Sequence, residues 1–271
     1  MATSGSVLSA DGTRLAYRAW PKSGSPALAV VHGLGEHAGR YAPFAEGMAH
    51  HSMGTYAVDL RGHGMSPGPR GHVDSWSQWT DDVAAFVSHI ESIAGGEVVP
   101  VGHSFGAVAV LSAVLAGKLP KARRFVVSSP ALKLKMAVAG WKLTLGPIAS
   151  KIVPRLALAN EVDPKSVSRI PDVVEAYRND PLVHNKISTR MGAEWQEATR
   201  HILSRASQIK IPFLILAGTA DALIDPAGSR ELHEQAKSTS ELRMLEGRFH
   251  EPFNDIGSDE VFKLIADWLK K

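Results

Sequence analysis

The sequence has no cysteine among its 271 residues. This absence excludes a disulfide framework, a thiolate nucleophile and any metal site built on cysteine ligands. The chain also lacks a large excess of either charge, because 30 lysines and arginines stand against 27 aspartates and glutamates, a formal net charge of +3. So small an excess gives no indication of a nucleic-acid partner, and we expect none.

Signals for membrane insertion or export are also scarce. The first six residues carry neither a basic segment nor an apolar one, so no secretory signal is visible. The longest run without a charged side chain, residues 98–117, contains Pro100, Gly102 and Gly106. These residues suit a sharp bend better than a lipid-facing helix. We therefore expect a cytoplasmic protein and leave peripheral contact with a membrane open.

Short apolar runs alternate with helical patterns over most of the chain. The expected strands are residues 27–32, 55–59, 98–101, 125–128, 213–217 and 242–245, and the expected helices are residues 41–50, 76–93, 105–115, 226–236 and 258–269. This alternation predicts an α/β fold with a mostly parallel central sheet. At the N-terminus, Asp11-Gly12 predicts an antiparallel hairpin with a two-residue turn.

One region breaks the alternation. Between residues 129 and 208 we find only helix-compatible pieces separated by prolines. We therefore expect an α/β core of residues 1–129 and 209–271, with residues 130–208 forming an all-helical cap, or lid, inserted between two strands. The first piece of this cap is apolar and also carries Lys133, Lys135, Trp141 and Lys142. It could touch a membrane surface transiently or simply cover a pocket, and both interpretations stay open.

The sharpest local motif is Gly102-His103-Ser104-Phe105-Gly106, a match to G-x-S-x-G. It lies between an expected strand and an expected helix, which is the context that a nucleophilic serine on a tight turn requires. Small residues are needed on both sides, because Cβ atoms there would collide with the crossing backbone. The motif predicts Ser104 as a nucleophile.

A serine hydroxyl needs a base, and a base needs an orienting carboxylate. In this architecture the acid and then the base follow the nucleophile, each after a later strand. His250 follows the strand at 242–245, and both Asp221 and Asp225 follow the strand at 213–217. Asp225 precedes Pro226 and suits a helix N-cap, so we assign the orienting role to Asp221.

Acyl transfer also needs donors for a developing oxyanion. The backbone N–H of Phe105, directly after the nucleophile, is one expected donor. The loop His32-Gly33-Leu34-Gly35 follows an early strand, and Leu34 N–H is the other. The same loop could also serve merely as a turn.

These motifs together resemble the monoacylglycerol lipase and lysophospholipase branch of the α/β-hydrolases. The resemblance covers about residues 10–269 and rests on VHGLGEHAGRY (31–41), DLRGHGMS (59–66), GHSFG (102–106), NDPL (179–182), Asp221 and His250-Glu251. It implies helices on both faces of the sheet and a serine hydrolase without cofactor or metal. Phe105 and Ala107 replace the methionine and glycine usual in relatives, but a backbone donor at Phe105 survives that change.

The resemblance further implies that Glu36, Arg40 and Tyr177 shape a polar pocket for glycerol, although Glu36 and Arg40 could instead form a structural salt bridge. His63 is expected to be structural. The expected activity is hydrolysis of a small lipid ester, above all a monoacylglycerol, through an acyl-enzyme on Ser104. A lysophospholipase and a general carboxylesterase are the alternatives among enzymes, and a non-catalytic ligand-binding module is the alternative from another class.

Overall fold

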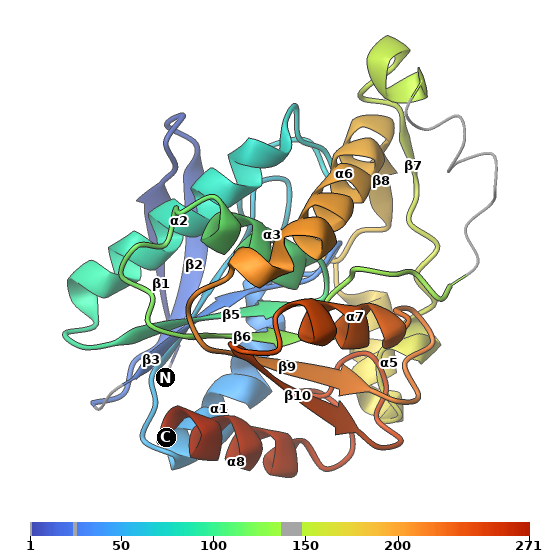
Figure 1. The fold of residues 1–271 in the computed structure, drawn as a ribbon. Coiled ribbons are helices and arrows are strands. Elements are labelled where there is room, and N and C mark those ends of the chain that lie inside the picture. The colour runs from blue at the N-terminus through green and yellow to red at the C-terminus, as the bar shows by residue number, and fades with distance from the viewer. Residues whose placement is uncertain (1, 24–25, 137–147) are drawn as a thin grey trace.

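The computed structural model describes residues 2–23, 26–136 and 148–271, and its centre is an eight-stranded sheet (Figure 1). The strand order is β1-β2-β4-β3-β5-β6-β9-β10. Six strands, from β4 to β10 in this order, are parallel, whereas β2 runs antiparallel to both β1 and β4. The bounds are β1 (Thr3–Leu8), β2 (Arg14–Trp20), β3 (Ala27–Val31), β4 (Thr55–Val58), β5 (Val98–His103), β6 (Phe125–Ser128), β9 (Phe213–Gly218) and β10 (Ser240–Leu245). The expected α/β class and mostly parallel sheet are confirmed.

The N-terminal hairpin is confirmed, but its turn is longer than expected. Ser9 N–H donates to the carbonyl of Thr13 at 2.8 Å, which leaves three residues in the loop. Gly12, the last of them, has a φ of 81°. A type I turn followed by a left-handed residue forms a bulged three-residue loop, so Asp11-Gly12 ends this turn and does not make up the whole of it.

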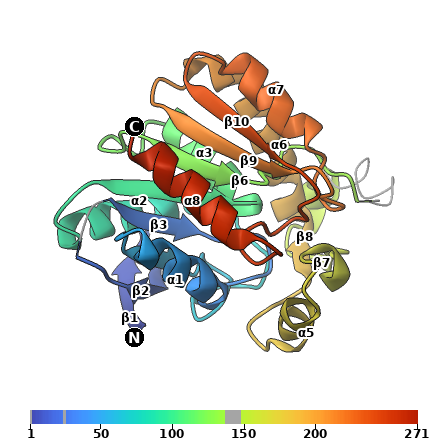
Figure 2. The ribbon, with the colours of Figure 1, turned by 90° about the horizontal axis from the view of Figure 1, so that it is seen from below.

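Helices cover both faces of the sheet, as the resemblance implied. The helices α1 (Ala42–His50) and α8 (Ser258–Leu269) lie against one face (Figure 2), and α2 (Trp76–Ile93), α3 (Phe105–Leu115) and α7 (Ala227–Gln235) lie against the other. Successive side chains of a strand point to opposite faces. In β3, Val30 therefore packs with α1 and α8, while Ala29 and Val31 pack on the α2 and α3 side.

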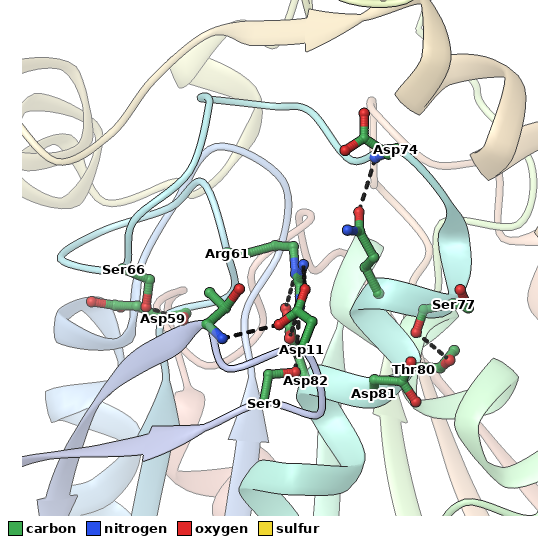
Figure 3. A network of polar contacts seen from close by, with 12 residues as sticks. Ser9, Asp11, Asp59, Arg61, Ser66, Asp74, Ser77, Thr80, Asp81 and Asp82 are labelled. Atoms are coloured by element: carbon green, nitrogen blue, oxygen red, sulfur yellow. Dashed lines mark hydrogen bonds and ion pairs between the residues drawn. The ribbon is translucent and has the colours of Figure 1, made fainter.

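The loop after β4 is fixed by the buried guanidinium of Arg61. Its Nε and Nη2 donate to the two carboxylate oxygens of Asp82 in α2 at 2.7 and 2.6 Å, and Nη1 donates to Asp11 at 2.7 Å (Figure 3). This arginine therefore connects the hairpin tip to α2. His63, two residues later, is fully buried, and its Nδ1 donates to the carbonyl of Arg61 at 3.1 Å.

The segment between β6 and β9 is mostly helical but not entirely so. It contains α5 (Pro171–Asn179) and α6 (Thr189–Arg205), and the short strands β7 (Ala157–Ala159) and β8 (Lys186–Ser188) form an antiparallel pair. The expectation of an all-helical insertion was therefore wrong. Three-residue strands are too short to show an alternating pattern in the sequence. In Figure 1, α5, β7 and β8 lie beyond the carboxyl ends of the parallel strands.

The first part of the insertion is attached to the loop after β9. Leu134 forms an isolated antiparallel bridge with Ile224, and the ammonium group of Lys135 donates to the carbonyl of Asp221 at 2.9 Å. Lys133 forms an ion pair with Glu231 of α7. Trp141 and Lys142, also expected on this piece of the cap, lie outside the described residues. Among the residues described, no helix is long and apolar enough to cross a membrane.

Candidate active site

Ser104 occupies the turn between β5 and α3 with a strained backbone, φ 53° and ψ −116°. This turn is tight enough to require glycine on both sides. A Cβ at Gly102 would lie 2.6 Å from the Cα of Ala107, and one at Gly106 would overlap the carbonyl oxygens of Val31 and His32. Real Cβ atoms do not approach other atoms so closely, so the two glycines allow the turn that presents the serine.

Three side chains from three different loops form a hydrogen-bonded chain. Nε2 of His250, in the loop after β10, lies 2.9 Å from Oγ of Ser104. Nδ1 of the same ring lies 2.7 Å from Oδ2 of Asp221, which follows β9. All three residues are buried. The structure therefore brings together the three residues that chain order and strand context selected.

The electrostatics of this chain match its geometry. Burial alone would lower the pKa of His250, but the charge and hydrogen bond of Asp221 outweigh it, so the pKa of the imidazole is raised. Burial alone would raise the pKa of Asp221, but His250 and the backbone N–H groups of Leu223 and Ile224 lower it. The carboxylate therefore stays ionised and holds the ring with Nδ1 protonated.

The two candidate acids have different partners. Oδ1 of Asp221 accepts hydrogen bonds from the N–H groups of Leu223 at 2.8 Å and Ile224 at 2.9 Å, and its other oxygen faces His250. Asp225 instead accepts from the N–H of Ala227, the first residue of α7, at 2.9 Å. Its carboxylate therefore caps the helix, as expected.

The loop His32–Glu36 packs directly against the nucleophile. Gly33 N–H donates to Oε1 of Glu36 at 2.6 Å, so this N–H is already occupied. Leu34 follows it and lines the same cavity as Ser104. Phe105 is the first residue of α3, a position whose N–H has no partner within the helix. The two expected donors, the N–H groups of Leu34 and Phe105, therefore belong to residues that line the cavity together with Ser104.

A cavity of about 850 Å³ opens at Ser104. One part of its wall is polar and includes Glu36, His103, Tyr177 and Glu251. The insertion, α6 and the loop after β9 supply most of the apolar lining, namely Leu132, Leu134, Met136, Leu156, Leu158, Ile187, Trp195, Leu223 and Ile224. The insertion and α6 also add polar lining residues, among them Asn160, Thr189, Gln196 and Thr199. A cavity of this size and polarity fits a small amphipathic molecule.

Glu36, Arg40 and Tyr177 do lie together, with Arg40 4.6 Å from the centre of the Tyr177 ring. Arg40 and Glu36 also form the ion pair considered from the sequence. Glu251 belongs to the same group of residues, since Arg40 binds its carboxylate with two nitrogens. Sequence reasoning did not identify Glu251 as a pocket residue. The available signal was its position directly after His250.

No group of three or more histidine, aspartate or glutamate side chains that could hold a metal ion occurs in residues 2–23, 26–136 and 148–271. The polar residues around Ser104 are instead engaged with one another through hydrogen bonds and ion pairs. The serine, imidazole and carboxylate groups at this site can supply a nucleophile, a base and a group that orients the base.

Comparison with known proteins relates this site to a family. The model of the serine aminopeptidase S33 hydrolases matches residues 24–257. A monoacylglycerol lipase of Mycolicibacterium smegmatis is 31% identical over 95% of this chain and 93% of its own length. An abhydrolase domain-containing protein of Dictyostelium discoideum is 32% identical over 98% of this chain, which spans only 28% of that relative.

A solved structure extends the comparison to the fold. The crystal structure of Paleococcus ferrophilus monoacylglycerol lipase superposes with a TM-score of 0.83 at 34% identity, covering 99% of this chain and 98% of that one. The resemblance found in the motifs is thereby confirmed. The chain belongs to the serine aminopeptidase S33 family of α/β-hydrolases, alongside the monoacylglycerol lipases.

Proposed function

We propose that this protein is a serine hydrolase of carboxylic esters, with monoacylglycerols as its main substrates. The observation that carries the proposal is the hydrogen-bonded chain from Asp221 through His250 to Ser104 at the wall of an 850 Å³ cavity. A nucleophile, a base within 2.9 Å and a carboxylate behind the base are what acyl transfer by serine requires.

The reaction proceeds in two halves. An ionised carboxylate only accepts hydrogen bonds, so Asp221 keeps the ring proton on Nδ1 of His250 and leaves Nε2 free to accept. Nε2 takes the proton of Ser104 as Oγ attacks the ester carbonyl, and then gives it to the departing alcohol. Water, activated in the same way, releases the fatty acid from the acyl-enzyme. The N–H groups of Leu34 and Phe105 would stabilise the negative oxygen in both halves.

The two parts of the cavity wall suit the two parts of a monoacylglycerol. Hydroxyl groups of glycerol can bind to the polar wall at Glu36, Tyr177 and Glu251. The apolar wall from the insertion and α6 can hold an acyl chain. The names of the Mycolicibacterium and Paleococcus relatives point to the same substrate class.

The cap is part of this proposal. We assign residues 130–208 to a cap over the cavity and the remaining chain to the core. Ile148, Ile152, Val153 and Leu156 are exposed on the cap, and Ile152 is 74% exposed. Exposed apolar side chains beside Lys151 and Arg155 fit transient contact with a lipid surface, from which a lipid ester would enter.

The test compares the wild type with Ser104→Ala. The wild type should hydrolyse 1-monoacylglycerols and react with a fluorophosphonate, and the variant should do neither. Turnover or labelling that persists in Ser104→Ala would remove the nucleophile from the proposal. A wild type that binds monoacylglycerol without reacting with the fluorophosphonate would instead be a non-catalytic ligand-binding module.

A second comparison addresses the alcohol group. We expect kcat/KM for 1-monoacylglycerol to exceed that for lysophosphatidylcholine with the same acyl chain, because the bulky, charged head group must fit against a wall already carrying Glu36 and Glu251. The reverse order would identify a lysophospholipase. Equal values for both lipids and for simple aryl esters would identify a general carboxylesterase.

A further inference from the structure

A buried arginine connects two loops of the site without lining its cavity. Nη1 of Arg40 donates to Oε2 of Glu36 at 2.9 Å and to Oε1 of Glu251 at 2.6 Å, and Nη2 donates to Oε2 of Glu251 at 2.7 Å. The three side chains are between 5% and 9% exposed. Glu36 and Glu251 are among the described residues that line the cavity, and Arg40 is not.

Glu36 transmits this attachment to the loop that bears Leu34. Its Oε1 accepts from Gly33 N–H at 2.6 Å and from the hydroxyl of Tyr41 at 3.0 Å, while its Oε2 faces Arg40. The conformation of the loop therefore depends on this carboxylate. A Cβ on Gly33 would lie 3.2 Å from Cβ of Ser104. The loop therefore packs so closely against the nucleophile that a shift of the loop would also displace Ser104.

Glu251 transmits the attachment to the loop that bears His250, its neighbour in the chain. Both of its carboxylate oxygens are held by Arg40, and Asn254 Nδ2 donates to Oε2 at 3.0 Å. The backbone here has its own hydrogen bonds, because Oγ of Ser129 donates to the carbonyl of His250 at 2.8 Å and the N–H of Glu251 donates to the carbonyl of Val167 at 2.9 Å. Arg40 thus adds a side-chain attachment to a backbone segment that Ser129 and Val167 also hold.

The cluster must remain charged to work in this way. Burial alone would raise the pKa of Glu36, but Arg40, together with His103, His32 and the N–H of Gly33, lowers it to about 2. Burial alone would lower the pKa of Arg40, but Glu251 and Glu36 raise it further above its usual range. A lysine cannot replace this arginine, because one ammonium group cannot match the planar fork that binds two carboxylates.

We propose that Arg40 is a positioning residue, which fixes the Leu34 loop relative to the His250 loop by holding Glu36 and Glu251 on one guanidinium. This inference rests on the proposed function and adds a role for a residue that need not touch substrate. It differs from direct binding of glycerol by Arg40, which would affect only substrates that contain glycerol.

The experiment uses two esters with the same acyl group, 1-octanoylglycerol and p-nitrophenyl octanoate. Arg40→Lys should lower kcat for both esters by a similar factor, about 10²-fold for a misalignment near 1 Å, with little change in either KM. The rate of fluorophosphonate labelling should fall in parallel. An increase confined to the KM for 1-octanoylglycerol, with p-nitrophenyl octanoate unaffected, would overturn the proposal in favour of direct contact.

Arg124→Lys is the matched control. Arg124 also binds a glutamate with two nitrogens, Nε to Oε1 of Glu97 at 3.0 Å and Nη2 to Oε2 at 2.9 Å. This pair lies just before β5 and β6, at the end of the sheet opposite Ser104. Its loss should leave both kcat values unchanged. Equal losses in Arg40→Lys and Arg124→Lys would show a general stability effect and overturn the positioning role.

A neutral triple variant covers the case in which Arg40→Lys does not fold. Glu36→Gln, Arg40→Met and Glu251→Gln together leave no unpaired buried charge, while the amide of residue 36 can still accept from Gly33. Slow labelling of this folded variant supports the proposal, and labelling at the wild-type rate overturns it. If the wild type itself does not react with the fluorophosphonate, it is the proposed function that fails.

Discussion

The carboxylate of Asp221 lies 2.7 Å from Nδ1 of His250, while Asp225, four residues further on, caps α7 through the N–H of Ala227. The two aspartates share one loop and have separate tasks. Asp221→Asn should lower kcat about 10⁴-fold, because an amide donor in place of the carboxylate favours the wrong tautomer of the ring. Asp225→Ala should retain kcat and lose about 1 kcal/mol of unfolding free energy. Steady-state kinetics and urea unfolding of both variants measure this, and the opposite ranking would make Asp225 the acid.

The raised pKa of His250 predicts the pH dependence of catalysis. The base must be neutral to accept the proton of Ser104, so kcat/KM should fall on the acid side with an apparent pKa above about 6.5, the ordinary value for histidine. In Asp221→Asn, the strongest of the charges that oppose burial is removed, and this limb should move to lower pH. A limb that stays in place would show that another group controls the profile.

The raised pKa of His250 lowers activity at acidic pH but increases the stability of the fold there. A pKa raised in the folded state means that charged His250 stabilises the fold fully below about pH 6.5, its pKa in the unfolded chain. This contribution is lost as the pH rises through the folded-state pKa. Urea unfolding of the wild type and His250→Gln across this range should show their difference shrinking with increasing pH. A difference that grows would contradict the raised pKa.

Two glycine-to-alanine substitutions should change the free energy of unfolding in opposite directions. A methyl group at Gly106 would overlap the carbonyl oxygens of Val31 and His32, so Gly106→Ala should lose about 3 kcal/mol or more. Gly192 lies inside α6, where a Cβ would meet only the Cδ1 of Ile187 at 3.9 Å. Gly192→Ala should therefore gain about 0.5–1 kcal/mol. Chemical unfolding compares the two, and destabilisation of both would mean that α6 does not tolerate a side chain there.

Gly192 also lines the cavity, so a large side chain at this position should shorten the acyl chain that fits. Gly192→Phe should reduce kcat/KM for palmitoyl esters about tenfold more than for butyryl esters. This corresponds to lost contact for two methylenes at about 0.8 kcal/mol each. Gly192→Ala is the control and should change the ratio little. Equal losses for both chain lengths would place the acyl chain elsewhere.

Much of the fold was predictable because its strands are strongly apolar. All five residues of β3 are buried, and runs of this kind identify the central strands of a parallel sheet. The Asp11-Gly12 pair predicted a hairpin, but the bounds of β1 were not predictable, since Thr3 to Ser6 are small and mostly polar and their strand conformation depends on pairing with β2. The pair β7 and β8 was missed for a related reason, because its three-residue strands are specified by tertiary contacts.

The residues of the candidate site were predictable where function imposes a local pattern. Ser104 has glycines two residues away on both sides, and Asp221 and His250 follow strands in a set order. Glu36 and Arg40 are only four residues apart, but the extended backbone of His37 separates them, so they pair across a turn and not along a helix. In contrast, Arg40 and Glu251 are 211 residues apart, and no local pattern connects them. The geometry of three loops meeting at one edge of the sheet determines that contact.

The separation of 146 residues between Ser104 and His250 also has a consequence for synthesis of the chain. The turn that presents the serine leaves the ribosome long before the imidazole that we propose as its base. A nascent chain therefore carries a hydroxyl with ordinary reactivity until its last strand has joined the sheet. Esterase activity should therefore appear only after the chain as far as His250 has been synthesised and has folded.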